Sequence, residues 1–327
     1  MKYIKYNFLK VASASLFCIS STFSFAKDDW QNEAVFRINK EPANATMSFH
    51  ESASDALNSK KSAYEISLNG NWKFHYCGNP KDRPFYFYKE DFDTSTWKEI
   101  PVPSNWQMHG FGSPLYMNNG FPFKTNPPYV MDEPDEANSN YPEELRNAVG
   151  SYKHEFDLPM QWGTQRVFIR FDGVSSAFYL WINGKKVGYS QDSRTPATFD
   201  ITDYIKAGRN TVAVEVYQYC DGSYLEDQDF WRLSGIFRPV TVYTLPQMRI
   251  VDVFNKAGLT SDYLDGTLTT EITLKNSASR TQSTILKGTL FTSDDKIVAT
   301  ASTNVSVKAG AMAKCKWDFA EIDNVKA

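Results

Sequence analysis

The chain has 327 residues, with 35 basic and 38 acidic side chains and a formal net charge of −3 at pH 7. This length predicts about two domains, and the absence of a basic block excludes the electrostatic surface of a nucleic-acid-binding protein. Hydrophobic residues make up 42% and charged residues 22%, a balance typical of folded chains. Aromatic residues reach 15%, which suits thick β-sheet cores and sugar binding alike, and composition alone favours the former.

The first 26 residues are predicted to be a secretory signal peptide. Three lysines in the first ten residues precede a small and apolar stretch that ends in a cleavage site at Ser24-Phe25-Ala26. That stretch is too short and too rich in serine for a membrane-spanning helix. Cys18 would fit lipoprotein processing, but the bulky Phe17 before it argues against that site. We therefore expect a periplasmic or secreted protein whose mature chain begins near Lys27.

Nearly every periodic segment after the leader is typical of a β-strand. The clearest strands combine aromatic and β-branched residues: 167–171, 177–182 and 211–217. The second of these leads into Asn183-Gly184, a strong signal for a two-residue hairpin. Helical patterns are limited to two short segments, 52–61 and 200–206. The sequence therefore predicts an all-β protein.

The segment 243–247 reads as a boundary between two β-sandwiches, one at 27–245 and the other at 247–327. Aromatic residues thin out after it, and five shorter strands are predicted: 249–254, 267–274, 284–291, 304–308 and 313–319. An immunoglobulin-like sandwich takes about seven strands and about 100 residues. We therefore expect the second sandwich to be incomplete, with an unpaired sheet edge.

Short catalytic motifs are absent from the sequence. The sequence has no phosphate-binding glycine loop, no metalloprotease or zinc pattern and no serine-nucleophile motif. Its four histidines are isolated from one another, which makes a histidine-based metal cluster or catalytic triad improbable. The cysteines after the leader, Cys77, Cys220 and Cys315, are too widely spaced for a disulfide framework.

Two segments have no evident role in building strands. One is 102–119, and the other is 221–232, where four carboxylates share a nine-residue loop with aromatic residues. Carboxylates this close need compensation from a cation, an arginine or backbone donors. The loop suits binding of a hard cation or of sugar hydroxyls, and turn-capping acids on a solvated loop would explain the same residues.

Several blocks occur together and in order: 67–74, 102–110, 171–174, 189–194 and 221–238. With them the chain resembles bacterial β-galactosidases of glycoside hydrolase family 2, densely over 28–245 and thinly beyond. The resemblance implies a jelly-roll domain, often called the sugar-binding domain, at 27–245 and an immunoglobulin-like domain at 247–327. A catalytic TIM barrel follows these domains in the family and is absent from this chain.

The resemblance also implies site residues. Asn118 matches a family asparagine that lines the galactosyl pocket, and Asp229 matches an acid that contacts the galactosyl group and a bound sodium ion. A structural magnesium is implied near five positions: Asp29, Asn32, Val35, Gln191 and Asp221. A solvated cluster of Asp and Asn side chains would explain these five about equally well. No organic cofactor is implied.

The family's acid/base and nucleophile are both glutamates on the barrel, so no catalytic residue is expected in this chain. Glu226 and Asp227 are not credible substitutes, because a bare acidic loop provides neither a raised pKa nor a positioned nucleophile. We expect a β-galactoside as the ligand, the barrel of the same parent chain as the partner, and no turnover by this chain alone. Exposed barrel-facing surface would also favour self-association.

Two other readings stay open from the sequence. One is a stand-alone carbohydrate-binding protein that uses the jelly-roll without chemistry. The other is a family member that acts on β-glucuronides or β-mannosides. The run 223–229 resembles galactosidases more closely, which favours a β-galactosidase over a family member that acts on glucuronides or mannosides.

Overall fold

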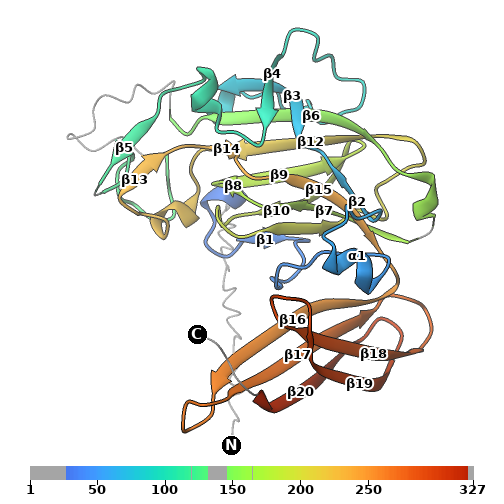
Figure 1. Cartoon of the computed structure of the whole chain (residues 1–327). Coiled ribbons are helices and arrows are strands. Elements are labelled where there is room, and N and C mark those ends of the chain that lie inside the picture. The colour runs from blue at the N-terminus through green and yellow to red at the C-terminus, as the bar shows by residue number, and fades with distance from the viewer. Residues whose placement is uncertain (1–26, 119, 132–145, 164, 323–327) are drawn as a thin grey trace, which may run out of the picture.

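The computed structural model describes residues 27–118, 120–131, 146–163 and 165–322 (Figure 1). The predicted signal peptide lies outside these residues. The described chain is built almost entirely of strands, which confirms the all-β prediction. No helix within the described residues is long and apolar enough to cross a membrane.

The first sandwich packs a seven-stranded sheet against a four-stranded sheet. The larger sheet has the order β1 (Arg37–Ile38), β10 (Lys185–Ser190), β9 (Ala177–Ile182), β12 (Arg209–Tyr217), β6 (Val149–Asp157), β3 (Gly70–Cys77) and β4 (Lys98–Val102). The smaller sheet has the order β11 (Ala197–Asp200), β7 (Arg166–Phe171), β15 (Val240–Leu245) and β2 (Glu65–Ser67). The strand pairs of these sheets are antiparallel, so hairpins and longer loops connect the strands rather than helices.

The main core lies between these two sheets. Alternate side chains of β3 point inward, so Trp72 and Phe74 are fully buried while the residues between them face outward. Tyr152 of β6 packs against both of them. This layer of large rings gives the sandwich its thickness, which is what the high aromatic content of the sequence provides.

The outer face of the larger sheet is covered as well. The short helix η1 (Asp29–Gln31) places Trp30 on Tyr217, with the two rings stacked 5.1 Å apart. The loop after β3 adds a second cluster around Phe87 and Trp97. Strand β12 is therefore buried along almost its whole length, on both faces. Both broad faces of this sheet are therefore covered by other described parts of the chain.

Helical structure is sparse, as the sequence predicts, but only one of the two predicted segments is helical. Helix α1 (Ala53–Leu57) begins where the Ser52 side chain accepts a hydrogen bond from the Asp55 amide. The prediction of a helix at 200–206 is wrong. The Asn210 side chain there bonds the backbone of Lys206 in both directions and holds the segment as turns.

Two short ribbons leave the edge of the first sandwich: β5 (Leu115–Met117) with β13 (Phe230–Arg232), and β8 (Val174–Ser175) with β14 (Gly235–Ile236). The remaining one-turn helices are η2 (Pro80–Asp82), η3 (Trp106–His109), η6 (Met160–Trp162) and η7 (Asp221–Tyr224). In Figure 1 the β5–β13 ribbon projects to one side of the sheets.

The second sandwich has a three-stranded and a two-stranded sheet. The first has the order β16 (Met248–Leu259), β17 (Gly266–Asn276) and β20 (Met312–Ile322), and the second pairs β18 (Gln282–Phe291) with β19 (Ile297–Val307). Each of the five predicted segments overlaps one of these strands, but the prediction of short strands is wrong, because they are 10–12 residues long and β19 begins at Ile297, before the predicted 304–308. Their small core is centred on Ile272, Leu274 and Leu286, and Trp317 packs over Gly288.

Candidate carbohydrate-binding site

The β5–β13 ribbon brings together two segments that are more than 100 residues apart in the sequence. Its register pairs Met117 with Phe230 and Tyr116 with Trp231. Continuing this register by one residue places Asn118 opposite Asp229. Because opposite residues of an antiparallel pair share a face, these last two pairs lie on the same side of the ribbon.

That side of the ribbon is exposed. Tyr116 is 51% and Trp231 53% exposed, with their rings edge to face at 5.6 Å, and Asn118 and Asp229 are exposed beside them. The Tyr116 hydroxyl donates a hydrogen bond to Asp229 Oδ1, and this bond raises the pKa of Tyr116. An exposed face with two aromatic rings, an amide and a carboxylate has the composition of a sugar-binding surface.

The other acids of the loop serve to hold it in place. Glu226 accepts hydrogen bonds from the Ser193 amide at 2.8 Å and from the Ser193 hydroxyl at 2.6 Å. Arg232 donates to the Glu226 carbonyl at 2.9 Å and forms an ion pair with Asp227. These contacts fix the middle of the loop to Ser193 and to Arg232 at its end, and Asp229 is exposed on the ribbon.

A small hollow of about 40 Å³ lies under the ribbon. Its lining includes the inward-facing residues Phe230 and Arg232, with a group of serines: Ser175, Ser176, Ser193, Ser223 and Ser234. This volume is far below the several hundred Å³ of a typical small-molecule pocket. A sugar would therefore lie on the exposed face and not in this hollow.

The residues implied as magnesium neighbours are partly gathered. Helices η1 and η7 contact each other, and Gln191 donates hydrogen bonds to Asp221 and to the Tyr189 hydroxyl. Burial raises the pKa of Asp221, and the nearby charge of Glu33 contributes in the same direction. A half-buried carboxylate in this situation is suited to a hard cation, which would compensate its charge.

The other three positions implied near magnesium have fewer oxygen atoms free to bind a cation. Asp29 accepts a hydrogen bond from the Tyr179 hydroxyl at 2.9 Å and lies 3.7 Å from the Lys186 ammonium. The Asn32 side chain and carbonyl accept bonds from Ala34 and Val35. The described residues contain no group of three or more His, Cys, Asp or Glu side chains arranged to hold a metal. Asp221 and Gln191 thus form the part of this set that fits a cation.

Two contributors to the site are missed by sequence reasoning. Tyr116 and Trp231 stand beside the predicted Asn118 and Asp229, inside the two segments that the sequence singles out, yet neither is predicted as a site residue. Strand alternation is the sequence signal that could have identified them, since residues two apart on a strand share a face. Tyr116 lies two positions before Asn118 and Trp231 two positions after Asp229.

The fold and this exposed ribbon define a β-sandwich protein with a candidate sugar-binding face. The family model for the sugar-binding domain of the glycosyl hydrolases family 2 matches residues 66–246, more than half of the chain. The chain belongs to this family.

Several curated relatives are β-galactosidases. The chain is 43% identical over 251 residues to the β-galactosidase of Priestia megaterium, a match that covers 76% of this chain and 24% of the relative. It is 44% identical to a Vibrio vulnificus β-galactosidase, over 75% of this chain and 22% of that protein. The chain therefore spans about a quarter of the length of these relatives.

Solved structures share the fold at lower identity. The β-glucuronidase of Bacteroides uniformis superposes with a TM-score of 0.61 at 21% identity, over 79% of this chain and 28% of that one. A putative β-galactosidase from Bacteroides fragilis gives a TM-score of 0.55 at 18% identity, over 80% of this chain and 36% of that one. Identities this low show the fold alone, so the glucuronidase likeness does not favour a glucuronide substrate.

Proposed function

We propose that this chain is the sugar-binding portion of a secreted β-galactosidase and that it supplies one wall of the pocket for a terminal β-galactosyl group. The observation that carries the proposal is the exposed face of the β5–β13 ribbon. Asn118 and Asp229 stand opposite each other there, beside the rings of Tyr116 and Trp231. The β-galactosidase relatives support galactose as the sugar.

The side chains of this face match the chemistry of a sugar ring. The Asp229 carboxylate accepts hydrogen bonds from hydroxyl groups, and the Asn118 amide both donates and accepts them. The Tyr116 hydroxyl occupies one oxygen of Asp229, which orients the carboxylate and leaves its other oxygen open. The Trp231 ring provides a flat apolar surface next to these polar groups.

A single exposed face buries too little of a sugar to bind it tightly, because closed sites bury about 70–90% of a ligand. The opposite wall would come from the catalytic barrel of the same parent protein. A retaining glycosidase needs two carboxylates about 5–5.5 Å apart. Glu226 and Asp227 are engaged with Ser193 and Arg232, so the chain by itself is proposed to be inactive.

Two cations belong to the proposal. The open oxygen of Asp229 would be a ligand for sodium, which would place a positive charge next to the sugar hydroxyls. Asp221 and Gln191 would hold a structural magnesium between η1 and η7. The predicted signal peptide supports secretion to the periplasm or the exterior as part of the proposal.

A chimeric enzyme tests the proposal directly. This chain replaces the matching quarter of the Priestia megaterium β-galactosidase, and hydrolysis of a chromogenic β-galactoside is measured. We expect an active chimera, and Asp229→Ala should lower kcat/KM about 10- to 100-fold because it removes charge-assisted hydrogen bonds to the sugar. Asp203→Ala, an exposed acid away from the ribbon, is the matched control and should have no effect.

Three results would contradict the proposal. The first is an active chimera in which Asp229→Ala has no effect. The second is a chimera that hydrolyses β-glucuronides or β-mannosides instead. The third is tight binding of galactose by this chain alone, which would favour the stand-alone carbohydrate-binding reading.

A further inference from the structure

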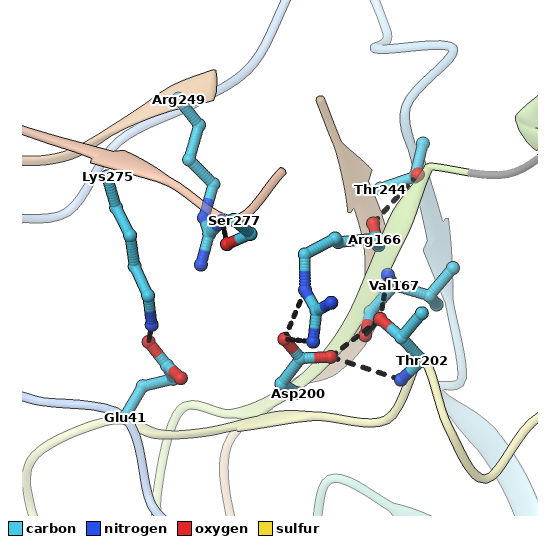
Figure 2. A network of polar contacts seen from close by, with 9 residues as sticks. All are labelled: Glu41, Arg166, Val167, Asp200, Thr202, Thr244, Arg249, Lys275 and Ser277. Atoms are coloured by element: carbon cyan, nitrogen blue, oxygen red, sulfur yellow. Dashed lines mark hydrogen bonds and ion pairs between the residues drawn. The ribbon is translucent and has the colours of Figure 1, made fainter. Parts of the chain in front are cut away.

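A buried arginine lies at the joint between the two sandwiches. Arg249 is only 5% exposed, and its side chain reaches from β16 toward the first sandwich. One guanidinium nitrogen donates a hydrogen bond to the Ser277 hydroxyl at 2.8 Å, and the group lies 4.9 Å from the centre of the Phe168 ring. The other terminal nitrogen, Nη2, is buried and has no partner in the described chain. Figure 2 shows a guanidinium nitrogen directed into the space between two neighbouring ion pairs.

The charges around Arg249 are already paired with one another. They form three ion pairs: Arg166 with Asp200, Arg170 with Asp172, and Lys275 with Glu41. Both oxygens of Asp200 are occupied, one by Arg166 and the other by the amide and hydroxyl of Thr202. Among the described residues around this joint, Arg249 is the cation that has no carboxylate partner. A buried cation without a paired counter-ion is unfavourable.

Two hollows meet at this arginine. The smaller, of about 40 Å³, contains Glu41, and the larger, of about 570 Å³, opens between the sandwiches. Both are lined by Met47, Phe49, Leu245, Arg249 and Ile250. The larger hollow is otherwise mostly apolar, with Pro246, Met248 and Val253 in its wall. Its size lies within the range of small-molecule sites.

A second polar atom in the larger hollow lacks a partner. His50 lines this hollow, and its Nδ1 is buried without a hydrogen bond, while Nε2 contacts the Ser48 hydroxyl at 3.0 Å. The hollow therefore combines an apolar wall with two unsatisfied nitrogens, those of Arg249 and His50. The Arg249 nitrogen is a donor, so the hollow suits a ligand that carries an acceptor at one end and an apolar body at the other.

We propose that the groove between the sandwiches binds a small monocarboxylate with an apolar body. Its carboxylate pairs with Arg249 where the two hollows meet, because an arginine–carboxylate hydrogen bond is charge-assisted. Its apolar body lies against Phe49, Leu245 and Ile250 in the larger hollow. A single negative charge fits best, because Glu41 lines the smaller hollow together with Arg249 and its carboxylate would repel a polyanion.

Calorimetric titration of the purified chain with octanoate tests this proposal. Octanamide has the same body without the charge, and acetate has the charge without the body. Arg249→Met keeps the length of the side chain but removes the cation, while Arg280→Met removes an exposed cation of the same sandwich as the matched control. Circular dichroism checks that each variant is folded.

We expect octanoate to bind, and octanamide and acetate to bind about 10- to 100-fold more weakly. Arg249→Met should weaken octanoate binding to the same extent, whereas Arg280→Met should leave it unchanged. If Arg249→Met does not fold, Ser48→Trp fills the mouth of the larger hollow from an exposed position and should abolish binding. Equal affinity for octanoate and octanamide, or no binding of either, overturns the proposal.

Discussion

The loop that carries Asp229 is held by Glu226, and removing this carboxylate should loosen the loop without touching the exposed ribbon. Glu226 accepts two hydrogen bonds from Ser193, one from the amide and one from the hydroxyl. Ser193 itself is buried in the turn that follows β10. Glu226→Ala would therefore leave two donors of Ser193 without an acceptor, one of them a backbone amide.

The expected cost follows from these two bonds. A hydrogen bond to a charged group contributes about 1.5–3 kcal/mol, and Glu226 is only partly buried, so water can replace some of what is lost. We expect Glu226→Ala to lower the free energy of unfolding by roughly 2–3 kcal/mol, and Glu226→Gln by about half as much, because glutamine keeps one acceptor oxygen.

Urea denaturation followed by tryptophan fluorescence measures this difference, and hydrogen exchange locates it. Exchange should accelerate at the Ser193 amide and across 221–228, while the amides of β13 and β12 should keep their protection. A loss below about 0.5 kcal/mol, the usual size of a neutral surface substitution, would refute the assignment of Glu226 as the brace of the loop. Faster exchange throughout the sandwich would show instead that the substitution disturbs the whole core.

Three further predictions concern the same sandwich. Burial lowers the pKa of His154, so the unfolded chain takes up a proton first as pH falls below about 6.5, and the folded chain loses stability. His154→Gln should reduce the loss of stability at acidic pH in thermal melts, whereas substituting the exposed His109 should not. In Gly188→Ala the new Cβ would lie 2.3 Å from the Ile38 carbonyl oxygen, so the free energy of unfolding in urea should fall by about 1–3 kcal/mol. Magnesium should raise the melting temperature of the chain but not that of Asp221→Asn. An equal rise in both would exclude Asp221 as a magnesium ligand.

Local signals explain why much of the fold is predictable from the sequence. The run 177–182 becomes β9 and 211–217 lies within β12, because strands with aromatic and β-branched residues carry their own pattern. The hairpin between β9 and β10 follows from Asn183-Gly184, and both residues adopt the positive φ values that such a turn requires. The turn at 200–206 is different, because the side chain of Asn210, which lies just after the segment, bonds the backbone of Lys206 and holds turns where the pattern predicts a helix.

The candidate site is less predictable because it depends on pairing over a long distance. Resemblance to the family identifies Asn118 and Asp229 separately, but only the β5–β13 register shows that they stand opposite each other. Nothing in the local sequence gives that register. The same holds for Arg249, which looks like an ordinary strand residue until the two sandwiches enclose it.

The two faces of the larger sheet explain why the candidate site lies on a ribbon at its edge. One face packs against the smaller sheet, and the other is covered by η1 and by the loop after β3, so neither presents side chains to a ligand. An exposed group of aromatic and acidic residues must therefore stand on a connection outside the sheets. Such a connection needs its own supports, and Glu226, Asp227 and Arg232 provide them. In the acidic loop, Glu226 and Asp227 thus hold the loop in place, and Asp229 is left exposed on the ribbon.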